Sequence, residues 1–227
     1  MTSGLRFLAL VALGSAGVTG APIAAQVAGL PVRNAGVGTG IGLSLDAGFP
    51  NTAAGKGFAM GATGAAGLGP LGVTASVSRY DPKDADALWS VGGTANLKVF
   101  GGPLIPLSVT FQAGAARSSQ DASTTPSDPL TIRTWHVPVG VGIALTIPNP
   151  VFAIKPWLAP RLDVVRTTIE SDAPPESNTD TNFAISGGVD LGFLSGLSLR
   201  VMYDRVMAGN GVHPSVLSIG VGFRVGT

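Results

Sequence analysis

The sequence predicts an all-β fold, an antiparallel transmembrane β-barrel of about ten strands preceded by a cleavable signal peptide. Three observations lead to this prediction. Apolar residues alternate with small or polar ones along most of the chain, the mean hydropathy is +0.40, and no apolar run beyond the N-terminus is long enough for a membrane helix. An apolar average without long apolar runs is typical of alternating strands.

The composition excludes several other classes of protein. The 227 residues suit one domain or one closed barrel. A net charge of +1, with only 12% charged residues, offers no basic surface for nucleic acid. Because there is no cysteine, neither a disulfide framework nor a thiolate metal site can form. We therefore expect no nucleic-acid partner, no cofactor and no metal.

The N-terminus has the three parts of a secretory signal peptide. Arg6 precedes an apolar stretch that ends near Val18, and small residues then lead to Ala25. We place the cleavage after Ala25; the apolar stretch is short for the alternative, an uncleaved membrane anchor. The expected organisation is a signal peptide at 1–25, a periplasmic N-terminal segment at 26–36 and the barrel at 37–227.

Period-two alternation marks each expected strand. It is clearest at 134–147, where Trp135, Val137 and Val139 share one face and His136 and Gly140 share the other. Each segment of this kind is about as long as a tilted bilayer-crossing strand. The expected strands are 37–47, 57–66, 71–80, 88–99, 105–117, 132–147, 152–167, 181–193, 197–207 and 215–225.

The connections between these strands alternate between two kinds. Short ones are rich in Gly, Pro and Asn, as tight turns require, and longer ones are polar. Short periplasmic turns that alternate with longer outer loops are typical of outer-membrane barrels. An even number of strands then leaves both termini at the periplasmic side. An eight-stranded barrel with the first hairpin outside it is the alternative.

Aromatic residues gather at both ends of the expected strands and point outward by parity. A barrel in a bilayer carries such belts at its two interfaces, whereas a soluble sandwich or lipocalin-like barrel would turn its apolar face inward. The pattern therefore favours the membrane barrel. The belt residues are Phe58, Trp89, Trp135, Phe183 and Tyr203 at the long-loop ends and Phe100, Phe152, Phe193 and Phe223 at the short-turn ends.

On these features, from Val37 to Val225, the chain resembles the small bacterial outer-membrane β-barrel proteins. The segment 215–225 is similar to the closing strand that the family's barrel-assembly machinery reads. The chain ends Phe223-Arg-Val-Gly-Thr227, whereas family members usually end on an aromatic residue. The resemblance implies export to the bacterial outer membrane, with outer-membrane lipid and the assembly machinery as partners. It leaves the oligomeric state open.

The expected inner face is rich in glycine, which leaves either free space or room for large partners across the strand ladder. A tight turn at Asn149-Pro150 predicts Trp157 opposite Gly142 and Asp163 opposite His136. The turn at 194–196 likewise predicts Asp190 opposite Arg200 and Met202 opposite Gly188. We interpret the glycines mainly as gaps that such partners fill.

Charged residues of both signs also face the expected lumen. Mutual pairing explains both signs better than a selective pore, which usually favours one sign. The predicted luminal charge network consists of Asp46, Lys98, His136, Lys155, Arg161, Asp163, Asp190, Arg200, Asp204 and Arg224. The leading functional hypothesis is a non-enzymatic barrel, either structural or a narrow passive pore. The alternative is binding or transport of small apolar molecules across the outer membrane.

A third hypothesis is a lipid-modifying hydrolase. An Asp can orient a His that acts as general base, and His136 and Asp163 could form such a pair. No motif identifies a nucleophile, and Ser186 and Ser218 are inward candidates without distinguishing context. We therefore predict no catalytic residues.

Five arginines lie at the long-loop ends of strands and point outward by parity. The arginine fork suits phosphate, so we predict that this rim contacts lipid headgroups, with lipopolysaccharide phosphates as the hypothesised ligand. Snorkelling, or pairing with the acidic loops, is the alternative. The rim residues are Arg79, Arg117, Arg133, Arg166 and Arg205.

Overall fold

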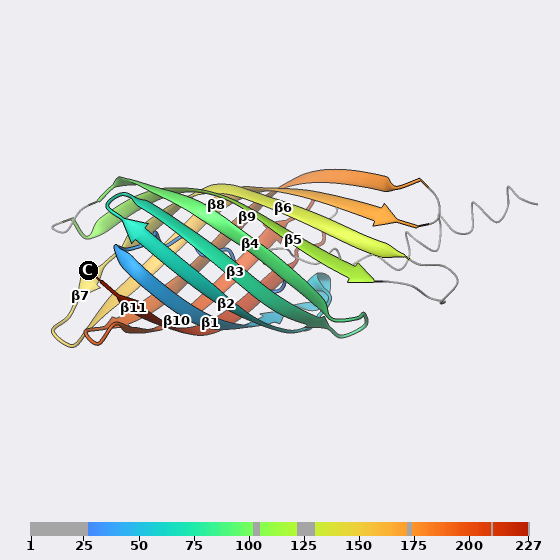
Figure 1. Ribbon diagram of the computed structural model, residues 1–227. Coiled ribbons are helices and arrows are strands. Elements are labelled where there is room, and N and C mark those ends of the chain that lie inside the picture. The colour runs from blue at the N-terminus through green and yellow to red at the C-terminus, as the bar shows by residue number, and fades with distance from the viewer. Residues whose placement is uncertain (1–26, 102–104, 122–129, 172–173, 210, 227) are drawn as a thin grey trace, which may run out of the picture.

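The structure, a computed structural model, describes residues 27–101, 105–121, 130–171, 174–209 and 211–226. Antiparallel strands tilt around a common axis and close into a ten-stranded barrel, which confirms the predicted fold class (Figure 1). The predicted signal peptide, residues 1–25, lies outside the described residues. The strands are β1 (Gly40–Pro50), β2 (Gly57–Leu68), β3 (Leu71–Pro82), β4 (Leu88–Phe100), β5 (Leu107–Asp121), β6 (Thr131–Leu145), β7 (Ile147–Pro148), β8 (Phe152–Glu170), β9 (Glu176–Phe193), β10 (Leu197–Met207) and β11 (Ser215–Val225).

Closure of the barrel comes from the pairing of its first and last strands. β1 pairs with β11 from Ile41↔Val225 to Pro50↔Val216, β6 pairs with β5 and β8, and the remaining long strands pair with their neighbours in the chain. β7 is only two residues long and continues β6 along β8. Because β1 and β2 are part of the ring, the eight-stranded alternative is wrong.

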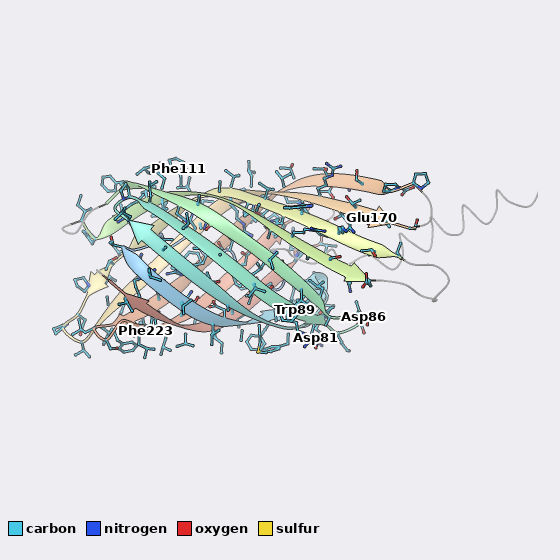
Figure 2. All side chains as sticks on the ribbon, viewed as in Figure 1. Asp81, Asp86, Trp89, Phe111, Glu170 and Phe223 are labelled. Carbon is cyan, nitrogen blue, oxygen red and sulfur yellow. The ribbon has the colours of Figure 1, made fainter. Side chains whose placement is uncertain are left out.

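Alternation along the strands turns large apolar side chains outward. Leu43 is 70% exposed and Phe223 is 52% exposed, although both lie in regular strands. The aromatic belts are present as predicted: Figure 2 shows Trp89 at the long-loop end and Phe223 at the short-turn end. Such an outer surface suits hydrocarbon rather than water. In the part of the chain that the structure describes, no helix has the length and apolar character needed to cross a membrane.

The strands differ in length. β8 has 19 residues and β9 has 18, whereas β10 and β11 have 11 each. The excess lies at the long-loop end, where polar pairs such as Thr168↔Ser177 extend the β8–β9 hairpin beyond its predicted bounds (Figure 1). Strands that rise above the bilayer need no apolar outer face. Hydrophobic alternation therefore did not reveal this extension.

The register of the β6–β8 pair corrects the sequence prediction. Pro148 pairs with Ala153, so the turn spans four residues, 149–152, instead of the predicted two. Every pair along the two strands is therefore shifted by two residues. Trp157 lies opposite Ala144, and Asp163 lies opposite Pro138, not opposite Gly142 and His136. The predicted pairs Asp190↔Arg200 and Met202↔Gly188 are confirmed, because Gly196, with φ of 84°, closes a tight β9–β10 turn.

The expected periplasmic segment is the second correction. Residues 27–35 lie inside the barrel, and all of them except the half-buried Arg33 are buried. Val32 and Ala28 are fully enclosed. Gln26 lies outside the described residues. The segment shows no strand alternation, so the period-two pattern gave no sign that it would lie inside the barrel.

Candidate functional site

The luminal segment, residues 27–39, runs through the barrel from one end to the other. At the short-turn end, Arg224 Nη1 donates a hydrogen bond to the main-chain oxygen of Gly38 at 2.7 Å. Near the long-loop end, Ser78 Oγ donates to the main-chain oxygen of Ala28 at 2.9 Å. Wall groups between these points bind the main chain as well, and the segment therefore occupies the lumen along most of its length.

Glycines in the wall provide the space for this segment. A Cβ added to Gly142 would overlap the main-chain oxygen of Asn34, and one added to Gly48 would overlap that of Gly29. A Cβ on Gly61 would lie 2.5 Å from Leu30 Cδ1. The prediction that large side chains across the ladder fill the gaps holds at Gly188, where Trp157 Cζ2 is 3.1 Å from the added Cβ. Side chains of neighbouring strands also fill the space at Gly140, where the partner is Arg161, and at Gly220, where it is Asp46. At Gly48, Gly61 and Gly142 the partner is the luminal segment.

The long-loop half of the lumen contains a buried ion network. Arg161 donates to Asp163 through two hydrogen bonds of 2.8 and 3.0 Å, and to Asp204 at 2.9 Å. The other oxygen of Asp204 accepts the main-chain N–H of Val32 at 3.0 Å. All three charged side chains are at most 2% exposed. One guanidinium thus bridges two carboxylates, and one of these carboxylates, Asp204, also binds the luminal segment.

An apolar layer lies at the same end of the barrel. Val27, Ala28 and Leu30 of the luminal segment pack with wall residues that include Ala59 and Tyr80. Tyr80 Oη donates to the main-chain oxygen of Ala54 at 2.6 Å, in the short 3₁₀ helix η1 (Thr52–Ala54). This half of the lumen is therefore closed by both apolar packing and ion pairs.

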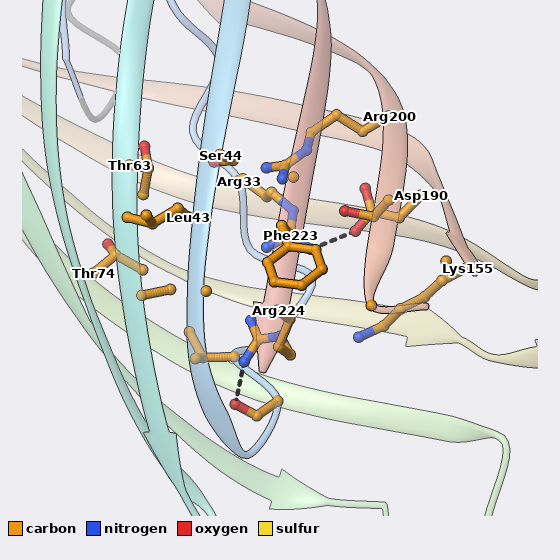
Figure 3. A pocket seen from close by; sticks show the side chains of 18 of the residues that line it. Arg33, Leu43, Ser44, Thr63, Thr74, Lys155, Asp190, Arg200, Phe223 and Arg224 are labelled. Atoms are coloured by element: carbon orange, nitrogen blue, oxygen red, sulfur yellow. Dashed lines mark hydrogen bonds and ion pairs between the residues drawn. The ribbon is translucent and has the colours of Figure 1, made fainter. Parts of the chain in front are cut away.

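The short-turn half contains a cavity of about 720 Å³ beside the luminal segment. Figure 3 shows Arg33, Lys155, Arg200 and Arg224 around it, together with Asp190. Among the described residues, the cavity lining holds four basic side chains and two acidic ones, the second being Asp46. This half is therefore hollow and carries an excess of positive charge.

The basic groups of this cavity are held in different ways. Arg33 forms an ion pair with Asp190, and Arg200 Nε lies 3.7 Å from Asp46 Oδ1, beyond hydrogen-bond distance. Lys155 Nζ donates to the main-chain oxygen of Ala35 at 2.6 Å. Sequence analysis predicted the Asp190–Arg200 pair from their opposite positions. The two residues do lie opposite each other, but Asp190 forms its ion pair with Arg33 of the luminal segment.

The ten predicted luminal charges all lie on the inner face, buried or half-buried. All but Lys98 belong either to the ion network around Arg161 or to the cavity around Arg200. His136 and Asp163 come together despite the shifted register, with Nε2 and Oδ1 3.3 Å apart, because they are diagonal neighbours. Sequence reasoning missed Arg33 and the segment that carries it. The glycine density of the inner face was the signal that something occupied the lumen.

The predicted rim arginines form a cluster and two separate residues. Trp135 lies directly between Arg117 and Arg166 on adjacent strands, and the guanidinium of Arg117 is 5.9 Å from the Trp135 ring centroid. Arg133, two residues before Trp135, forms an ion pair with Glu170. Arg79 on β3 and Arg205 on β10 lie apart from this cluster. Four of the five side chains are exposed, and Arg133 is half-exposed.

His136 and Asp163, the pair of the hydrolase hypothesis, lie within the buried ion network. Asp163 is engaged by Arg161, and Ser186 Oγ donates to the main-chain oxygen of Val32 at 2.7 Å. His136 itself is only 1% exposed. Within the described ranges, no group of three or more His, Cys, Asp or Glu side chains is placed to hold a metal ion.

Comparison with protein families gives one match. The model of the outer membrane protein beta-barrel domain matches residues 10–224, nearly the whole chain. A comparison with curated protein sequences gives no match.

Several known structures resemble the chain. The translocator domain of the autotransporter NalP from Neisseria meningitidis has a TM-score of 0.45 and 15% identity, covering 83% of this chain and 89% of that one. The outer membrane protease OmpT from Escherichia coli has a TM-score of 0.47 and 8% identity, covering 82% and 94%. Neisserial surface protein A has a TM-score of 0.40 and 16% identity, covering 82% and 98%. Similarities at this level say nothing about function.

Proposed function

The chain belongs to the outer membrane protein beta-barrel domain family, and from this premise we propose that it is a non-enzymatic barrel closed by its own N-terminal segment. It is a β-barrel protein of the bacterial outer membrane. Within that class, a structural role or a narrow passive pore are the leading possibilities. The luminal segment favours the structural role, or a pore that conducts only after the segment moves.

The observation that carries this proposal is the fit between segment and wall. Charged and polar wall groups bind the main chain at Val32, Ala35 and Gly38, and wall glycines accept its bulk. A barrel of about eight strands is filled by its own side chains, and one of sixteen or more encloses a channel. Ten strands with many inward glycines would leave a gap, and residues 27–39 occupy part of it here.

Single-channel recording tests the proposal. The expected mature chain, residues 26–227, is refolded and inserted into a planar bilayer, and a chain that begins at residue 39 is compared with it. We expect no conductance from the mature chain and steady conductance steps from the shorter chain. Circular dichroism and gel mobility with and without heating serve as the control that both chains are folded. Steady steps from the longer chain would contradict the closed barrel. Absence of conductance from a folded shorter chain would show that residues 26–38 are not what blocks the lumen.

The non-enzymatic part of the proposal rests on the burial of His136 and the occupation of Asp163 and Ser186 by other partners. We expect no hydrolysis of phospholipid or peptide substrates by the refolded chain. A measured activity that disappears in a folded His136→Ala variant would overturn this expectation.

We further propose that the cluster of Arg117, Arg133, Arg166 and Trp135 binds the phosphates of lipopolysaccharide. Three guanidinium groups around one exposed indole offer both charge and an amphipathic ring at the level of the headgroups. The ion pair with Glu170 already balances the charge of Arg133. We therefore expect Arg117 and Arg166 to make the main contacts with phosphate.

Lipid binding is tested with two matched variants. One replaces the clustered Arg117, Arg133 and Arg166 by Gln, and the other replaces the separate Arg79 and Arg205 by Gln. Thermal unfolding is measured in bilayers with and without lipopolysaccharide. We expect lipopolysaccharide to stabilise the unaltered chain and the second variant, and to stabilise the first variant much less. Equal stabilisation of all three proteins would show that the cluster is not a lipopolysaccharide site.

A further inference from the structure

The cavity in the short-turn half has the size and the lining of a binding site. Its volume of about 720 Å³ lies within the range of small-molecule pockets, about 300–1,000 Å³. Hydroxyl groups of Ser44, Thr63 and Thr74 line it beside the charged residues. A few polar groups around a preformed space are what fixes a ligand in such pockets.

The charges around this cavity do not balance. Arg33, Lys155, Arg200 and Arg224 face only Asp46 and Asp190, which leaves a formal charge of +2 among the described lining residues. Lys155 and Arg224 have main-chain oxygens of the luminal segment as their hydrogen-bond partners, and these oxygens carry no full charge to neutralise them. A cleft lined by one sign of charge attracts ions of the other sign.

Arg200 provides the most specific observation. Its side chain is only 10% exposed, and its Nε has no hydrogen-bond partner within the described part of the chain. The carboxylate of Asp46 stays 3.7 Å away. A buried guanidinium N–H without a partner is unfavourable, and an oxyanion in the cavity would satisfy it.

From these features we infer that the cavity binds a small organic molecule through a phosphate or carboxylate group. The ligand enters from the short-turn end, which faces the periplasm in barrels of this class. Lining residues from the β9–β10 turn, such as Ser195 and Gly196, and from the end of β11, such as Gly226, place the cavity at that end. Arg200 and Arg224 bind the oxyanion, and the hydroxyl groups contact the rest of the molecule. This site does not depend on whether the barrel conducts.

Isothermal titration calorimetry tests the inference, with the mature chain in a phosphate-free detergent at constant ionic strength. The probes are inorganic phosphate, glucose 6-phosphate and glucose. We expect one molecule of inorganic phosphate or glucose 6-phosphate to bind per chain, and glucose not to bind. Absence of binding by both anions, or equal binding of glucose, would overturn the site.

Variants distinguish the cavity from the arginines on the outer surface. Arg200→Gln and Arg224→Gln should each weaken glucose 6-phosphate binding about tenfold or more, because each removes a charge-assisted hydrogen bond. Arg200→Lys keeps the charge and should retain most of the affinity. Arg224→Gln removes no carboxylate partner, so its fold is not expected to suffer even if Arg200→Gln misfolds.

The matched control is Arg205→Gln, in the same strand as Arg200 but exposed at the other end of β10. It should leave the affinity unchanged. Affinity lost in Arg205→Gln and kept in folded Arg224→Gln would place the anion on the outer surface and overturn the inference.

Discussion

The two halves of the lumen differ in the balance of their buried acidic and basic groups. In the long-loop half, Arg161 lies between Asp163 and Asp204, and every oxygen of the two buried carboxylates accepts a hydrogen bond. In the short-turn half, four basic groups surround a cavity with two carboxylates. The described charges of the first half have an excess of acid, whereas those of the second have an excess of base and surround an open volume.

The luminal segment matches this difference through its main chain. In the acidic half, the N–H of Val32 donates to Asp204, and in the basic half the oxygens of Ala35 and Gly38 accept from Lys155 and Arg224. A peptide offers a donor and an acceptor at nearly every residue, so its main chain can bind regions of opposite charge, and Arg33 adds the one charged side chain of the segment. The comparison therefore assigns a structural role to the first half and a binding role to the second.

The largest loss of stability is expected from Arg161→Ala in the long-loop half. This change leaves Asp163 and Asp204 buried without their cation, and breaking a buried pair in this way costs about 3–5 kcal/mol. The free energy of unfolding is measured by urea titration of the refolded chain in micelles. Arg200→Ala in the short-turn half is the matched change, and we expect a smaller loss because its ion pair is longer. Equal losses would mean that the two halves do not differ as described.

Alternation and turn residues were enough to predict the barrel, its ten strands and the outward belts. They also put the luminal charges on the correct face, because a register shift of two residues preserves parity. The sequence could not reveal that Arg33 pairs with Asp190 or that the N–H of Val32 donates to Asp204, since both belong to a segment with no strand pattern. The position of such a segment depends on the three-dimensional shape of the barrel wall. This shape forms only when the barrel closes, so local sequence patterns do not contain it.

The second prediction concerns the fit of the segment in the wall. Gly142→Ala brings a Cβ onto the main-chain oxygen of Asn34, and overpacking of this kind costs about 1–3 kcal/mol. Gly192→Ala is the control, because nothing lies within 4 Å of the added Cβ. The readout is the same urea titration, together with protease cleavage of the segment. We expect faster cleavage in Gly142→Ala only. Identical behaviour of both variants would mean that the segment is not seated against Gly142.

The third prediction is a smaller effect at the middle of the segment. Ser186→Ala removes the 2.7 Å hydrogen bond to the main-chain oxygen of Val32, and a lost hydrogen bond of this type costs about 1 kcal/mol. Ser218→Ala is a suitable comparison, because Ser218 is equally enclosed but its Oγ has no hydrogen-bond partner among the described residues. If Ser218→Ala destabilises the chain as much as Ser186→Ala, then the hydrogen bond to the segment contributes nothing of its own.

The smallest effect on stability is expected from Arg224→Gln at the mouth of the cavity. Its hydrogen bonds to Gly38 and Thr39 are exposed, and exposed interactions of a charged group contribute about 0–1 kcal/mol. We therefore expect this variant to lose anion affinity without losing stability. Urea titration should detect little change, while calorimetry should detect weaker anion binding. A large loss of stability would make Arg224 part of the barrel's closure and would remove the distinction between a structural half and a binding half.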